Sequence, residues 1–206
     1  MLRVDDRPLG EHDQPIRLPP EACRRTLLKL AIAGGLAAFP GAARAAGEPQ
    51  DPAKLRPQPD DRFVHVSGDK KGEEVRPDDL QTGAAQLLAW PLDPQTRTVR
   101  DGSLLNQVLI VRLDTADLDD ATKSRAADGI VAYSAICTHA QCPVTGWNGD
   151  KKLLHCPCHQ SDYDPSQNAK VVFGPAPRSL PALPLRIDGG VLVAAAAFTG
   201  RIGVHS

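Results

Sequence analysis

Two short segments of this sequence carry the residue types best suited to bind a metal. The first, CTHAQCP, spans residues 137–143, and the second, CPCHQS, follows after twelve intervening residues and spans residues 156–161. Each segment offers two thiols and one imidazole within a few residues. Thiolates and neutral imidazoles are the ligands of protein zinc sites and of some iron–sulfur clusters. The pattern therefore indicates a metal centre built from two loops.

The residue types alone leave two alternatives. Two cysteines and two histidines also make a tetrahedral zinc shell, although common zinc patterns pair Cys with Cys and His with His at short spacing. The four cysteines could instead form two ordinary disulfides beside exposed histidines, but the repeated Cys–His pairing argues against this. The remaining histidines have no partner at ligand spacing, and we interpret them as structural or exposed: His12, His65, His155 and His205.

Both segments, their spacing and the additional cysteine in each resemble the Rieske iron–sulfur proteins. The resemblance covers roughly residues 60–200 and implies a 2Fe–2S cluster, with Cys137 and Cys156 on one iron and His139 and His159 on the other. Two imidazoles in place of two thiolates leave the oxidised cluster neutral, so an electron is accepted more readily. Rieske potentials accordingly lie at about −150 to +300 mV, against about −400 mV for plant-type ferredoxins.

The same resemblance assigns roles to residues around the ligands. It implies a disulfide between Cys142 and Cys158 that ties the two loops together. It also implies that Ser161 donates a hydrogen bond to a cluster sulfide and that Tyr163 donates one to a ligating thiolate, both of which raise the potential. The sequence GPAP at residues 174–177 is similar to the proline-rich loop that lies over the cluster in this family.

The two loops also depart from the quinol-oxidising members of the family. Gln160 stands where many of them have Gly, and Ala140 and Gln141 replace the usual Leu-Gly or Met-Gly. In cytochrome bc complexes an apolar loop tip docks at the quinol pocket, so a small Ala and a polar Gln argue against such docking. The long segment 72–128 is nearer in style to exported Rieske subunits such as the small subunit of arsenite oxidase.

The elements that must position these loops are short strands. Only 4% of the residues are aromatic, and 19 prolines and 17 glycines favour strands joined by turns over a helical bundle. With the resemblance, this predicts an all-β Rieske fold of three small antiparallel sheets, with the cluster-binding loops at one tip. A hairpin is indicated at residues 188–190, and an exposed helical excursion at 114–129. The predicted strands are 63–66, 86–90, 107–113, 130–136, 152–155, 171–173, 183–187 and 191–198.

The first 45 residues are typical of a twin-arginine export signal. Arg24-Arg25 precede an uncharged run over residues 30–43, and Ala43-Arg44-Ala45 fits a small-x-small cleavage site. An uncleaved membrane anchor is the closest alternative, but the run is shorter than the about 20 apolar residues that span a bilayer. Residues 46–60 are proline-rich and predict an extended linker, which leaves residues 61–206 for the Rieske domain.

Charge and composition bound the function. With 24 Lys plus Arg against 25 Asp plus Glu, the net charge of −1 gives no general attraction to nucleic acid or to anionic membranes. The sequence shows neither a nucleophile–base set nor a nucleotide-binding glycine loop, and about 200 residues leave no room for the catalytic domain of a Rieske oxygenase. We therefore expect an electron-transfer protein rather than an enzyme.

That protein is expected in the periplasm, or anchored to the outer face of the cytoplasmic membrane by an uncleaved signal. The favoured role is the electron-transfer subunit of a periplasmic oxidoreductase, which passes electrons from a larger subunit to a c-type cytochrome. The alternative is the Rieske subunit of a quinol-oxidising cytochrome bc complex, where the partner is cytochrome b.

Overall fold

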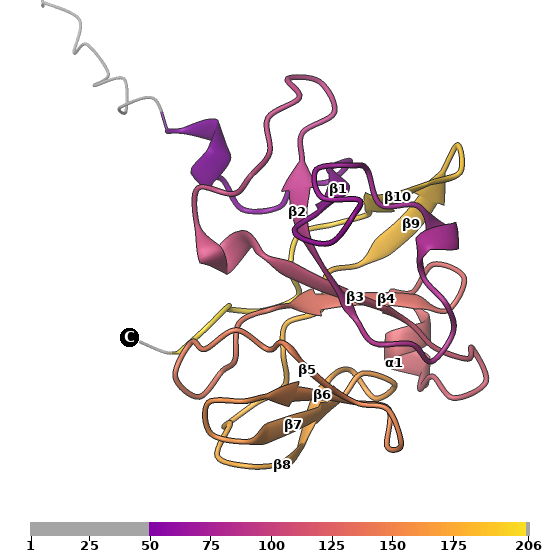
Figure 1. Ribbon diagram of the computed structural model, residues 1–206, viewed down its shortest axis with the longest axis vertical. Helices are drawn as coiled ribbons and strands as arrows, with labels where there is room; N and C mark the ends of the chain where they lie inside the picture. The colour runs from indigo at the N-terminus through magenta and orange to yellow at the C-terminus, as the bar shows by residue number, and fades with distance from the viewer. Residues whose placement is uncertain (1–49, 205–206) are drawn as a thin grey trace, which may run out of the picture. The chain divides into compact units, whose positions relative to one another are not determined.

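A computed structural model describes residues 50–204 of the chain, and within them the fold consists almost entirely of strands (Figure 1). The predicted all-β fold of three antiparallel sheets is confirmed. The first sheet has the order β1-β2-β3-β4, with β1 Arg62–His65, β2 Leu87–Leu92, β3 Val108–Arg112 and β4 Ile130–Ser134. The second has the order β5-β6-β7-β8, with β5 Gly146–Asn148, β6 Leu153–Cys156, β7 Ser161–Asp164 and β8 Lys170–Phe173. The third is the hairpin of β9 Leu185–Asp188 and β10 Val191–Ala194.

Strands β3 and β4 form the centre of the domain because both of their faces are covered. Figure 1 shows them crossing the domain between the β9–β10 hairpin and the β5–β8 sheet. One face, with Leu109 and Tyr133, packs with residues of the β5–β8 sheet, and the other, with Ile110, packs with residues of β9 and β10. This double burial explains why β3 and β4 are nearly continuous apolar runs.

The β5–β8 sheet is smaller and more polar, and two of its strands were not predicted. β5 has only three residues, and β7 reads SDYD. In β7 the side chains alternate: Ser161 and Tyr163 are buried, while Asp162 and Asp164 are half-buried. This alternation with a period of two is that of a strand. Because Ser161, one of the two buried residues, is small and polar, a search for alternating apolar residues does not detect it.

The last strand is shorter than predicted. β10 ends at Ala194, so the prediction of strand through Phe198 is wrong. Ala194 pairs with Leu185, the first residue of β9, and the preceding Pro184 has no N–H to continue the ladder. The backbone N–H of Ala195 instead donates to the Pro184 carbonyl at 2.8 Å, and the chain turns away from the sheet.

Helical structure in the described range is limited to single turns. The predicted excursion contains α1 (Asp120–Lys123), whose first turn is capped by Asp119, which accepts a hydrogen bond from the Thr122 N–H at 2.7 Å. The three 3-10 turns are η1 Pro52–Lys54, η2 Pro77–Asp79 and η3 Leu104–Asn106. None of the helices in residues 50–204 is long and apolar enough to cross a membrane.

Asp79, at the end of η2, accepts hydrogen bonds from three groups. They come from Lys70, from the Arg76 backbone N–H at 2.7 Å and from His65 Nε2 at 3.2 Å. Burial by itself raises the pKa of this carboxyl, but these donors outweigh it and lower the pKa to about 2. The carboxylate therefore ties η2 to the loop that follows β1.

The described part of the predicted linker is attached to the domain. The Asn106 side chain donates to the carbonyls of Ala53 at 3.3 Å and Leu55 at 2.9 Å, and Arg100 donates to that of Pro52 at 3.2 Å. Arg100 itself is almost fully buried and makes two hydrogen bonds, of 2.7 and 3.0 Å, to the Asp61 carboxylate. Backbone groups that the sequence predicts to be solvated are thus bonded to buried polar side chains. The predicted signal, residues 1–45, lies outside the described residues.

Candidate metal centre

The two cysteine–histidine segments form two loops of similar construction. The first follows β4, and the second is the turn between β6 and β7. In the first loop the Gln141 N–H donates to the Cys137 carbonyl at 3.1 Å, and in the second the Gln160 N–H donates to the Cys156 carbonyl at 3.0 Å. Both glutamines have a φ of 59°, the left-handed conformation that favours glycine. A glycine at either position would adopt this backbone without strain.

The sulfur atoms of Cys137 and Cys156 are the buried thiols of the site. Both cysteines are unbonded and no more than 2% exposed. Burial raises the pKa of Cys156, and the neighbouring Cys137 thiol raises it further. The backbone N–H groups of Cys158 and His159 act in the opposite direction and lower it, but the net shift is upward. Two buried thiols at close range become thiolates readily only when a cation compensates their charge. The pair therefore fits a metal.

The two histidines of the segments lie against each other. The ring centroids of His139 and His159 are 4.6 Å apart, and their planes meet at 82°. Nδ1 of His139 is buried and has no hydrogen-bond partner among the described residues. A buried polar atom without a partner is costly, and a metal ion would satisfy it. The donor set thus fits a cluster held by two sulfurs and two ring nitrogens, and the ligand roles stay a prediction.

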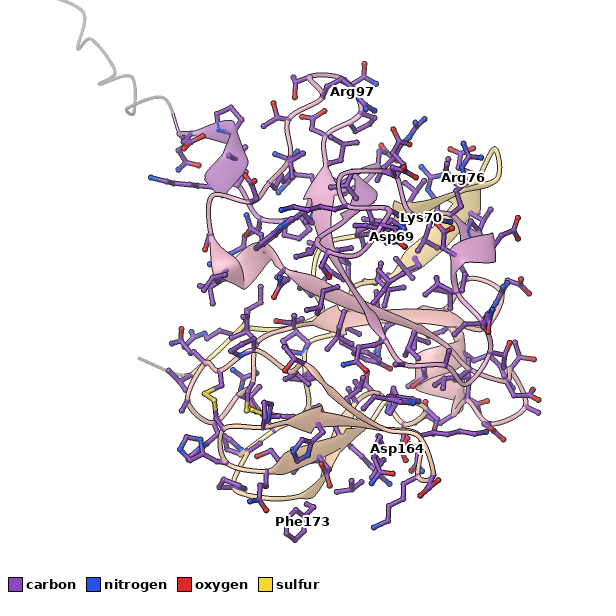
Figure 2. The ribbon with its side chains drawn as sticks, viewed as in Figure 1. Asp69, Lys70, Arg76, Arg97, Asp164 and Phe173 are labelled. Carbon is purple, nitrogen blue, oxygen red and sulfur yellow. A yellow bond between two sulfur atoms is a disulfide. The ribbon has the colours of Figure 1, made fainter. Side chains whose placement is uncertain are left out.

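A disulfide joins the two remaining cysteines of the loops. Cys142 and Cys158 are bonded, with their Cα atoms 6.4 Å apart (Figure 2). The Cys156 sulfur lies within 4.8 Å of both disulfide sulfurs. The bond therefore closes the two loops directly beside one of the predicted ligands.

Tyr163 contacts the other predicted sulfur ligand. Its hydroxyl oxygen lies 3.1 Å from Cys137 Sγ and accepts a hydrogen bond from the Thr138 N–H at 3.3 Å. Burial first, and the Cys137 sulfur second, raise the pKa of Tyr163, so the hydroxyl keeps its proton. Because the oxygen already accepts from Thr138, the proton is available to the sulfur. This geometry is compatible with donation from Tyr163 to a ligating sulfur, and that role stays a prediction.

Ser161 and the GPAP segment cover the second loop. The fully buried Ser161 hydroxyl accepts from the Ala176 N–H at 3.2 Å, which leaves its own proton free to donate to a cluster sulfide. Gly174 has a φ of 88°, and a Cβ there would lie 2.6 Å from the Gln160 carbonyl oxygen. The proline-rich segment therefore packs directly on the loop that contains His159.

Sequence reasoning missed Thr138 and Arg178. Thr138 is 1% exposed, and its hydroxyl donates to the Arg178 carbonyl at 2.7 Å. A small hydroxyl residue between two predicted ligands, and an arginine directly after GPAP, were the available signals. His155, by contrast, lies on the other face of the sheet and pairs with Asp162 at 2.6 Å, in line with a structural role.

Comparison with known proteins identifies relatives of this chain. A family model described as Rieske [2Fe-2S] domain matches residues 93–184. The cytochrome bc1 complex Rieske iron-sulfur subunit of Streptomyces lividans is 33% identical over 138 residues, which cover 64% of this chain and 79% of that protein. The subunit of the same name in Corynebacterium glutamicum is 39% identical over 104 residues, or 48% of this chain and 26% of that protein.

The chain spans 26% and 37% of the length of the relatives from C. glutamicum and Corynebacterium efficiens. The soluble domain of Rieske protein II from Sulfolobus acidocaldarius matches 47% of this chain and 66% of its own, with 23% identity and a TM-score of 0.35.

Proposed function

Because this chain belongs to the Rieske 2Fe–2S family, we propose that it binds the cluster through Cys137, Cys156, His139 and His159 and serves as the Rieske subunit of a cytochrome bc complex. The observation that carries the ligand assignment is a pair of free, buried thiols that act on each other and a pair of imidazoles in contact, one of them with an unpartnered buried nitrogen. When bound, a 2Fe–2S cluster takes up and releases one electron at a time.

The residues around the ligands set the conditions for that transfer. The Tyr163 hydroxyl, 3.1 Å from Cys137 Sγ, stabilises negative charge on this sulfur and so favours the reduced state. The half-buried His139 and the exposed His159 bring the imidazole side of the site toward solvent, where a redox partner can approach. The disulfide and the GPAP segment keep the two loops closed over the sulfur side.

The choice of complex rests on the relatives. Those of S. lividans and C. glutamicum are named as subunits of the cytochrome bc1 complex, which favours the bc complex over the periplasmic oxidoreductase that the sequence first suggested. The proposed partners are cytochrome b and a c-type cytochrome acceptor, on the outer face of the cytoplasmic membrane. Export by the twin-arginine route suits a protein that receives its cluster before it crosses the membrane.

A specific observation keeps the oxidoreductase subunit as a second candidate. Ala140, Gln141 and Gln160, at the tips of the two loops, are all exposed. Small or polar residues at an exposed loop tip offer little apolar surface to a quinol pocket. The same residues fit the polar rim of a transient electron-transfer interface.

One experiment tests both levels of the proposal. The tagged full-length chain is purified from its native host after mild detergent extraction, and its iron, acid-labile sulfide, EPR spectrum and co-purifying subunits are determined. We expect two irons, two sulfides, the rhombic signal of a mixed Cys/His cluster, and cytochrome b in the eluate. Zinc without iron would refute the cluster. A large non-haem oxidoreductase subunit in place of cytochrome b would refute the bc assignment and support the second candidate.

A further inference from the structure

We infer that Arg178 is a positioning residue that fastens the first ligand loop to the C-terminal segment, residues 199–204. The inference rests on the proposed function, because it takes Cys137 and His139 as ligands. It concerns a connection that neither motif contains: the C-terminal segment, the proline-rich loop and the first ligand loop meet at this one arginine.

The C-terminal segment has a defined path. Its beginning is held by two hydrogen bonds between Thr199 and Ala182: the Thr199 N–H donates to the Ala182 carbonyl at 2.8 Å, and the Thr199 hydroxyl accepts from the Ala182 N–H at 3.1 Å. Gly203, near its end, is buried. Figure 1 shows this yellow end of the chain beside the loop that follows β4, which is the first ligand loop.

Arg178 binds this segment through its guanidinium. One terminal nitrogen donates to the Arg201 carbonyl at 2.7 Å, and the other donates to the Gly203 carbonyl. A planar, always charged fork suits two carbonyl acceptors two residues apart, and a lysine ammonium cannot reproduce this geometry. The C-terminal segment is thus held at two points by a single side chain.

The backbone of the same residue binds the first ligand loop. The Arg178 carbonyl accepts the Thr138 hydroxyl at 2.7 Å, and Thr138 lies between the two predicted ligands Cys137 and His139. The Thr138 N–H in turn donates to the Tyr163 hydroxyl, which lies 3.1 Å from Cys137 Sγ. These hydrogen bonds, together with the covalent bonds within Arg178 and Thr138, therefore connect the C-terminal segment to the sulfur.

A second contact joins the same partners without Arg178. A Cβ added at Gly203 would lie 3.1 Å from Cγ and Cδ of the Gln141 side chain, so the segment packs tightly on the tip of the first loop. Gln141 closes that loop through its N–H bond to the Cys137 carbonyl. Loss of the Arg178 bridge should therefore let the segment and the loop tip loosen together.

The test compares Arg178→Lys, which keeps the charge, with Arg178→Gln, which removes it. The matched control is Arg186→Gln on β9, because Arg186 also makes two hydrogen bonds, to Asp60 and Asp188, but outside the site. Hydrogen–deuterium exchange at the Cys137 and Gln141 amides and EPR of the reduced protein are measured in all variants. The exchange needs no redox partner and reports on the loop directly.

We expect both Arg178 variants to exchange these two amides roughly tenfold faster, to release iron faster and to show altered EPR g values, while Arg186→Gln matches the wild type. Tenfold corresponds to about 1.4 kcal/mol, the scale of one charge-assisted hydrogen bond. If Arg178→Lys exchanged these amides at the wild-type rate while Arg178→Gln exchanged them faster, the positive charge alone would matter. That result would overturn the proposal that Arg178 bridges the segment and the loop. Unchanged exchange in both would overturn it as well.

Gly203→Ala provides a second arm if an Arg178 variant fails to fold. This substitution keeps the Arg178 side chain, but it crowds Gln141 and strains the backbone at Gly203, whose φ is 71° and whose carbonyl accepts from Arg178. We expect faster exchange at Gln141 with folding retained; unchanged exchange would count against the contact. Failure of the proposed function is a different result: the wild-type protein would then bind no iron–sulfur cluster, while the exchange comparison would still report on the bridge.

Discussion

Removing the Tyr163 hydroxyl should lower the reduction potential of the cluster. Tyr163→Phe deletes one oxygen, which lies 3.1 Å from Cys137 Sγ, and leaves the ring in a fully buried position. The reduced cluster carries one more negative charge than the oxidised one, so a donor to its sulfur ligand stabilises the reduced state more. The change therefore acts on the difference between the two redox states.

The size of the effect follows from the hydrogen bond. A bond to a charged group contributes about 1.5–3 kcal/mol, and only the part that differs between the redox states, about 1–2 kcal/mol, shifts the potential. At 59 mV per factor of ten for one electron, this corresponds to a fall of about 45–90 mV. The Thr138 N–H also loses its acceptor at 3.3 Å, which adds a cost in stability.

The assay is protein-film voltammetry at constant pH, with thermal unfolding recorded in parallel. Tyr133→Phe is the matched control, because Tyr133 is equally buried but its hydroxyl donates to the Pro165 carbonyl at 2.7 Å and not to a sulfur. We expect both variants to lose stability and only Tyr163→Phe to change the potential. Equal potentials for wild type and Tyr163→Phe, or equal shifts in the two variants, would refute the reasoning and leave Tyr163 as a packing residue.

Three further substitutions test other parts of the domain. Cys142→Ser opens a disulfide across 16 residues, worth about 3 kcal/mol in loop closure, and should speed iron release more than it lowers the unfolding midpoint of the sheets; equal effects on both would argue against a local clamp. Asp61→Ala removes the nearer of the two carboxylates that pair with the buried Arg100, leaves Asp93 at 3.3 Å, and should cost up to about 3–5 kcal/mol in urea unfolding; a loss below about 1 kcal/mol would show that Asp93 or water replaces the partner. The pKa of Asp79, lowered to about 2, lies below its unfolded value near 3.9, so its contribution of about 2 kcal/mol is present above about pH 4 and lost as the pH falls towards 2. Asp79→Asn should flatten stability between pH 4 and 2, and an unchanged pH profile would contradict this.

The sequence by itself was enough to locate the candidate site. Both ligand pairs are local, since Cys137 and His139 lie within one loop and Cys156 and His159 within another, so their spacing survives any arrangement of the sheets. The central strands β3 and β4 were equally accessible, because burial on both faces demands continuous apolar runs. The sequence did not decide between the two kinds of complex. A loop tip of Ala140 and Gln141 does not identify the partner protein that binds it.

Only the tertiary structure decided how the loops are closed and supported. β7 is a strand because its neighbours pair with it, although its four residues SDYD read as polar, and β10 stops where Pro184 opposite cannot donate. The bonds of Arg178 to Gly203 and Thr138, and of Asn106 to Leu55, join residues 25 to 51 positions apart. A hydrogen bond between such positions depends on the folding of everything between them, and no local pattern of residue types reports it.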